Sequence, residues 1–183
     1  LITYMRTDST NVAAVAQQNA RQVISERYGE EFLPEEPPTY KTRAKAAQEA
    51  HEAIRPTSVF RAPEAIKRYL SRDQYRLYDL IWRRFIASQM KPAVYDTISV
   101  QILAGVGEER PYLFRASGST LRFAGFLIVY EETKDEDKDE EKTQAIPPLE
   151  EGELLDLMRL LPEQHFTQPP PRYTDASLIR TLE

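Results

Sequence analysis

The chain has 183 residues, of which 41% are hydrophobic and 10% aromatic, enough for one or two globular domains with their own cores. It has no cysteine and only two histidines, which excludes a disulfide framework and disfavours a structural zinc site. No apolar run reaches the roughly 18 residues of a membrane span, and no basic-then-apolar leader is present. The chain opens on Leu1 rather than on a methionine, and we expect it to be a piece of a longer protein.

The net charge of −5 hides an uneven distribution. Residues 131–142 hold eight acidic residues and three lysines, which accounts for the whole excess. Residues 1–92 carry 15 basic and 11 acidic groups, whereas residues 93–183 carry 9 and 18. Because local positive fields rather than the overall charge attract nucleic acid, the first half is the candidate for weak polyanion binding.

The beginning of the chain predicts a strand followed by a helix. Residues 1–5 have the apolar and β-branched character of a short strand. Ser9 or Thr10 can cap a helix over residues 11–28, where apolar side chains recur at helical spacing. Gly29 is placed to end that helix.

A second helical region follows. Residues 41–50 predict a basic loop that enters a short helix, which Pro56 ends. Pro63 suits the first turn of the next helix, and Ser71 can cap a longer one over residues 72–90. Aromatic side chains on this longer helix could stack on nucleic-acid bases, but their helical spacing favours packing in a core. These side chains are Tyr75, Tyr78, Trp82 and Phe85.

Strand patterns begin after Pro92. Alternation of apolar and polar residues predicts a half-buried strand over residues 95–103. Three shorter strands are expected after it, separated by turns that contain glycine. These strands are expected at residues 112–116, 120–123 and 126–131.

The last third alternates between irregular and regular segments. The acidic run, residues 131–142, predicts a solvated loop because its charges repel one another. Another strand is expected over residues 153–161, followed by a proline-rich extended linker over residues 167–173. Thr174 can cap a helix that runs to residue 183.

These elements indicate an α+β fold. We expect a helical domain over residues 1–91 and a β-rich domain over residues 92–167, followed by a linker and the start of a further helical domain over residues 168–183. The β-rich part is expected to be antiparallel.

A tyrosine, an arginine and an aspartate come together in residues 3–10, Thr-Tyr-Met-Arg-Thr-Asp-Ser-Thr. A tyrosine hydroxyl has a reference pKa of about 10, so it needs activation before it can attack. Phenolate is also a good leaving group, so the formation of a phosphotyrosine ester is reversible. On a strand, Tyr4 and Arg6 leave the same face, and Met5 points into the core. Arg6 can then grip two phosphate oxygens, and Asp8 can orient Arg6 or a histidine.

A second block, residues 48–57, reads Gln-Glu-Ala-His-Glu-Ala-Ile-Arg-Pro-Thr. On a helix, His51 and Arg55 would share a face because they are four residues apart. Arg55 can bind a DNA backbone or pair with Glu52 or Glu49, and both alternatives stay open. The two glutamates themselves are expected on an exposed helix face.

Together, in this order, the two blocks resemble the active-site signature of type IA DNA topoisomerases. Met5 is more typical of the bacterial topoisomerase I branch than of the topoisomerase III branch. Reverse gyrase has a related sequence in this region. Further stretches along nearly the whole chain are similar to this family. They are Leu80-Ile81-Trp82-Arg83-Arg84-Phe85, Ser88-Gln89-Met90 and Pro170-Pro171-Arg172-Tyr173-Thr174.

The resemblance implies a fragment of a toroidal multidomain enzyme that cuts and reseals single-stranded DNA without ATP and relaxes negative supercoils by strand passage. It implies that Tyr4 forms a 5′-phosphotyrosine with the help of Arg6. Asp8, His51 and Arg55 are expected to support the site or contact DNA. Mg²⁺ is expected in a Toprim domain absent from this chain, so the chain alone should be inactive. The implied partners are DNA and the remaining domains of the enzyme, in the bacterial cytoplasm at the nucleoid.

Two other functional classes are alternatives to this enzyme. Tyrosine recombinases and type IB enzymes also form phosphotyrosine, but they place several Arg and His residues before a C-terminal tyrosine, unlike Tyr4. The second is a non-catalytic scaffold that binds single-stranded DNA. Substitution of Tyr4 by Phe separates the enzyme from the scaffold.

Overall fold

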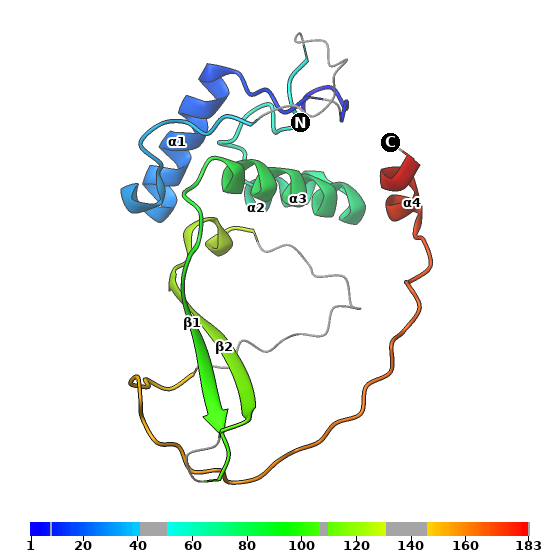
Figure 1. Ribbon diagram of the computed structural model, residues 1–183. Helices are drawn as coiled ribbons and strands as arrows, with labels where there is room; N and C mark the ends of the chain where they lie inside the picture. Colours follow the sequence, from blue (N-terminus) through cyan, green and yellow to red (C-terminus); the bar gives the residue numbers. More distant parts are fainter. Residues whose placement is uncertain (8, 41–50, 107–109, 131–145, 183) are drawn as a thin grey trace. The chain divides into compact units, whose positions relative to one another are not determined.

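The computed structural model describes residues 1–7, 9–40, 51–106, 110–130 and 146–182 (Figure 1). It has two compact units, residues 1–147 and residues 148–183, and each is described by itself. The first unit combines helices with a two-stranded antiparallel sheet, which confirms the expected α+β class.

Helix α1, Ala14–Tyr28, begins three residues later than the sequence predicts. Neither Ser9 nor Thr10 caps it, because the N-cap residue is Ala13, which has no side-chain acceptor. The end is as predicted: Gly29 has a φ of 111°, a conformation that favours glycine, and its N–H donates to the Ile24 carbonyl at 3.2 Å. Local chemistry therefore sets the end of α1 but not its beginning. A 3₁₀ turn, Glu30–Phe32, follows.

Helices α2, Pro63–Ile66, and α3, Arg72–Ser88, follow the predicted signals, with a 3₁₀ turn, Lys67–Tyr69, between them. Pro63 occupies the first turn of α2. Ser71 and Gln74 form a reciprocal capping box at α3, with the Gln74 N–H donating to Ser71 Oγ at 3.3 Å and the Ser71 N–H to Gln74 Oε1 at 3.0 Å.

The core of the first unit lies between α1 and α3. Three of the four aromatic residues predicted for the core of α3 are buried, with exposed fractions of 3% for Tyr78, 3% for Trp82 and 5% for Phe85. The indole N–H of Trp82 donates to the Val59 carbonyl at 2.9 Å, which satisfies its polar atom. These three rings pack in the core and are not available for base stacking. They meet the buried face of α1, which consists of Ala16, Ala20, Val23 and Ile24.

The Tyr78 hydroxyl gives a prediction on alkaline stability. It donates to the Arg61 carbonyl at 2.8 Å, and burial raises the Tyr78 pKa above its ordinary value while the Arg61 charge lowers it. Because the folded state holds this proton more tightly, the contribution is complete below the unfolded pKa of about 10 and is lost as pH rises above it. We expect Tyr78→Phe to cost about 1 kcal/mol near neutral pH and to flatten the alkaline decline of stability. Urea unfolding of both proteins from neutral to alkaline pH measures this, and an unchanged alkaline slope would contradict it.

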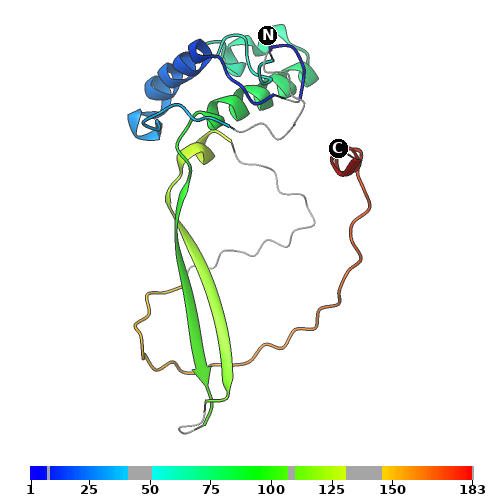
Figure 2. The same ribbon diagram turned by 45° about the horizontal axis from the view of Figure 1, so that its top comes forward.

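Strands β1, Val94–Ala104, and β2, Tyr112–Phe123, form one antiparallel hairpin, which Figure 2 shows as a long ribbon. Two of the short strands that the sequence predicts are therefore a single strand, because the backbone at Gly118 stays paired with Ile98. The prediction of a third short strand over residues 126–131 is wrong. Residues Gly125–Ile128 form a 3₁₀ turn in which Gly125 has a φ of 50° and lies against the Pro92 backbone, where a Cβ would come within 2.5 Å.

The second unit has one regular element, helix α4, Asp175–Leu182. Thr174 caps it as predicted, with the Ser177 N–H donating to Thr174 Oγ1 at 3.2 Å. The strand expected over residues 153–161 is wrong, since this segment is exposed and pairs with no described strand. The acidic run lies outside the described residues. Across the described ranges, no helix has the length and apolar character needed to cross a membrane.

Candidate active site

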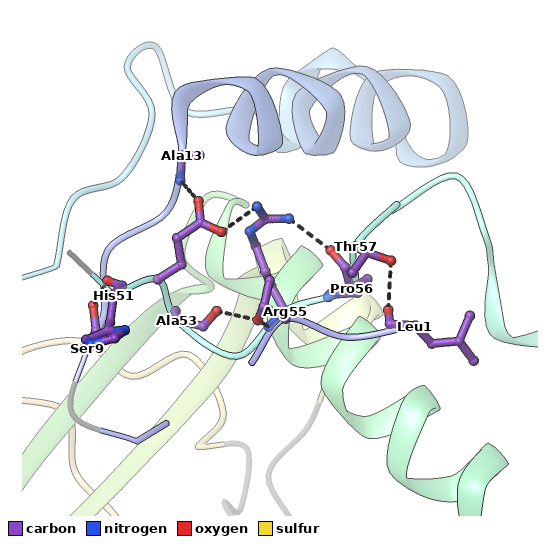
Figure 3. Close-up of polar contacts among 10 residues, drawn as sticks. Leu1, Ser9, Ala13, His51, Ala53, Arg55, Pro56 and Thr57 are labelled. Carbon is purple, nitrogen blue, oxygen red and sulfur yellow. Dashed lines mark hydrogen bonds and ion pairs between the residues drawn. The ribbon is translucent and has the colours of Figure 1, made fainter. Parts of the chain in front are cut away.

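The chain before Tyr4 pairs with residues 51–57, which we term the bracing segment (Figure 3). The strand expected over residues 1–5 is reduced to a single bridge with two flanking hydrogen bonds. The contacts are the Ile2–Pro56 bridge, the Thr3 N–H to the Arg55 carbonyl at 2.9 Å and the Thr57 N–H to the Leu1 carbonyl at 2.9 Å.

The bracing segment also holds the chain after Tyr4, where it leads into α1. Residues 4–7, which we call the tyrosine loop, therefore lie between two attachments to the same segment. The contacts of the second attachment are Ser9 Oγ to the His51 carbonyl, the Ala53 N–H to the Asn11 carbonyl at 2.8 Å and the Ala13 N–H to Glu52 Oε1 at 3.1 Å.

Tyr4 is open to solvent, since the residue is 81% exposed. Met5 is 73% exposed, so the expectation that it points into the core is wrong. The reason is that the tyrosine loop does not continue the strand pairing, and strand alternation no longer decides which side chain is buried.

Arg6 contacts His51, with Nη1 and Nε2 2.7 Å apart. A guanidinium has only donors, so this contact is a hydrogen bond in the tautomer in which His51 Nε2 is the acceptor. The structure thus brings together one residue from each sequence block, across 45 positions of the chain. Asp8, the third member of the first block, lies outside the described residues.

Residues 51–55 are not helical, so the expectation that His51 and Arg55 share a helix face is wrong. Of the two alternatives for Arg55, pairing is observed: its Nη2 lies 2.6 Å from Glu52 Oε2, and its Nη1 donates to the Pro56 carbonyl at 3.0 Å. The exposed helix face expected for Glu52 is also wrong, because its carboxylate is shared between Arg55 and Ala13. Glu49 lies outside the described residues.

The comparisons with known proteins agree over the whole chain. Residues 1–183 match the family model described as DNA topoisomerase. This chain belongs to the DNA topoisomerase family. It is 49% identical, over 185 aligned positions, to DNA topoisomerase 1 of two Xylella fastidiosa strains, Temecula1 and 9a5c. Each alignment covers 100% of this chain and 22% of the relative. The full-length topoisomerase I from Thermotoga maritima has a similar structure, with a TM-score of 0.75 and 36% identity over 99% of this chain and 27% of that protein.

The sequence did not predict the part that Thr3, Ser9 and Glu52 play in the two attachments of this topoisomerase segment. Thr3 Oγ1 donates to the Ala53 carbonyl at 2.9 Å and accepts from the Arg55 N–H at 3.0 Å, so it lies inside the first attachment. Ser9 and Glu52 contribute hydrogen bonds to the second attachment. No sequence signal indicated these contacts, because the start of α1 after Ala13, which leaves the helix without a capping side chain of its own, is set by the structure and differs from the predicted start.

The described parts of the chain contain no group of three His, Asp or Glu side chains that could hold a metal ion. Those residues therefore do not fit a magnesium site.

Proposed function

We propose that this chain supplies the nucleophile of a type IA DNA topoisomerase, which breaks and rejoins single-stranded DNA and relaxes negatively supercoiled DNA by strand passage. The observation that carries this proposal is the tyrosine loop: an exposed Tyr4, attached on both sides to the bracing segment, with Arg6 in contact with His51. Family membership favours this enzyme over the non-catalytic scaffold.

Tyr4 is proposed to attack a backbone phosphorus through its hydroxyl oxygen. The new bond joins Tyr4 Oη to phosphorus, and the bond from phosphorus to the 3′ oxygen breaks. The tyrosine hydroxyl loses one proton and the 3′ oxygen gains one, so that oxygen leaves as a hydroxyl. The 5′ phosphate stays on Tyr4 as an ester. Attack by the same 3′ hydroxyl reverses each step, so the strand is resealed without an added energy source.

Arg6 is proposed to stabilise the charge that builds up on the phosphoryl oxygens. We expect Arg6→Ala to slow cleavage about 10²-fold or more at saturating DNA, and Arg6→Lys to retain part of the rate because an ammonium keeps the charge but not the fork of donors. Single-turnover cleavage of an oligonucleotide measures both. Arg76→Ala, at an exposed position on α3, is the control and should leave the rate unchanged. Equal effects of Arg6→Ala and Arg76→Ala would contradict this role.

The same proposal includes the partners, the cofactor and the cellular location of this activity. The chain spans only 22% of its curated relatives, so the rest of the enzyme must supply what the chain does not hold. We infer that it acts with the remaining domains of the same protein, on single-stranded segments of DNA at the bacterial nucleoid, and that the enzyme requires Mg²⁺ bound by those other domains. Asp8 is proposed to support the site beside Arg6.

Covalent trapping tests the proposed function. A chimera in which this chain replaces the matching segment of the Xylella fastidiosa relative is mixed with a labelled single-stranded oligonucleotide and Mg²⁺, and the adduct is mapped by mass spectrometry. We expect an adduct on Tyr4 through the 5′ phosphate. An adduct on another residue would overturn the proposal. So would no adduct from a chimera that folds and binds the oligonucleotide as tightly as the relative.

A further inference from the structure

The two attachments of the tyrosine loop are joined to each other by a pair of charged side chains. Glu52 belongs to the attachment after the loop, because its Oε1 accepts from the Ala13 N–H at the start of α1. Arg55 belongs to the attachment before the loop, because its backbone N–H and carbonyl both bond to Thr3. The 2.6 Å contact between Glu52 Oε2 and Arg55 Nη2 therefore links both ends of the loop that carries Tyr4.

The surroundings of this pair favour a lasting contact. The Arg55 side chain is 14% exposed and that of Glu52 is 34% exposed, so solvent screens their attraction less than it would at an open surface. Each partner also has a second bond, from Arg55 to the Pro56 carbonyl and from the Ala13 N–H to Glu52. A hydrogen bond between two ionised groups is shorter and stronger than a neutral one.

Glu52 does more than neutralise Arg55. Helix α1 has no capping side chain of its own, and its first N–H groups lack partners within the helix. A carboxylate at this end accepts one of these donors and is favoured by the positive end of the helix dipole. Glu52 thus holds the residue that precedes α1, on the far side of the tyrosine loop.

We propose that Glu52 and Arg55 act as positioning residues for Tyr4, by setting the separation between the two ends of the tyrosine loop. Arg55 then acts through Glu52 and Thr3 rather than by binding DNA. This inference rests on the proposed function, in which Tyr4 attacks a phosphate. Small displacements of a reacting group slow a reaction strongly, so loss of the pair should lower the rate of strand cleavage without weakening DNA binding.

The test uses the chimera with Glu52→Ala, Glu52→Gln, Arg55→Ala and the double Ala variant. The cleavage rate is measured in a single turnover at saturating oligonucleotide, and the dissociation constant is measured separately with Tyr4→Phe added to prevent cleavage. We expect both Ala variants to lower the rate about 10- to 100-fold, with dissociation constants within about twofold of the parent. Because the pair acts as a unit, the double variant should be no slower than the slower single variant.

Glu52→Gln separates the two bonds of the carboxylate. Its amide oxygen can still accept from the Ala13 N–H, but it has no charge to hold Arg55, so we expect a rate between those of the parent and Glu52→Ala. Ser71→Ala is the matched structural control, since it removes a helix cap of similar strength at α3, away from the tyrosine loop. It should lower the melting temperature as Glu52→Ala does and leave the cleavage rate unchanged.

Three results would overturn the inference. An Arg55→Ala variant that binds DNA more weakly but cleaves at the parent rate when saturated would make Arg55 a DNA contact. If Ser71→Ala slows cleavage as much as Glu52→Ala does, the pair contributes only to the general stability of the protein. Unchanged rates in all variants would remove any role. Failure of the proposed function looks different, because the parent chimera itself would then form no adduct on Tyr4.

Discussion

A Tyr4→Phe variant of the chimera is expected to form no covalent adduct with single-stranded DNA, a loss of at least about 10⁴-fold in cleavage. The substitution removes only the hydroxyl oxygen that would bond to phosphorus. Because the side chain is 81% exposed, little packing is lost, and both the melting temperature and oligonucleotide affinity should stay at the parent values. Denaturing electrophoresis of the trapped product measures the adduct.

The matched control is Tyr69→Phe, at a tyrosine that is 69% exposed in the turn between α2 and α3. It removes the same atom from a similarly open side chain and should cleave like the parent. Persistence of the adduct in Tyr4→Phe would place the nucleophile at another residue and leave the tyrosine loop without its proposed role.

Replacement of Trp82 by alanine is expected to destabilise the chain by about 3–5 kcal/mol. The ring is 3% exposed at the centre of the α1–α3 core, and its indole N–H satisfies the Val59 carbonyl at 2.9 Å. Truncation therefore removes buried apolar area, leaves a cavity and orphans a carbonyl. Urea unfolding, followed by far-ultraviolet circular dichroism, gives the change in free energy.

Leu77→Ala serves as the control, because Leu77 lies on the same helix and is 57% exposed. Its substitution should cost no more than about 1 kcal/mol, which separates the effect of the core from the effect of altering α3. If Trp82→Ala costs as little as Leu77→Ala, the aromatic face of α3 is not the centre of the fold.

Three helix ends were predictable because their signals are local. The Ser71 cap, the Gly29 end and the Pro63 first turn each depend on residues within a few positions of one another, and all three are found. Strands depend on a partner. The hairpin forms because two alternating segments are close in sequence, whereas residues 153–161 have the residue pattern of a strand but no described strand to pair with.

The sequence by itself determined the family, the α+β class and which residues are candidates for the active site, since residue identity and order are enough to find Tyr4, Arg6 and His51 in two motif blocks. Only the tertiary structure decided that Arg6 meets His51, that Met5 is exposed and that Glu52 joins Arg55 to the start of α1. The contacts of Arg6 and of the α1 cap connect positions about forty residues apart, and periodicity within a segment carries no information about them. A chain reaches such contacts only when the fold places both segments side by side.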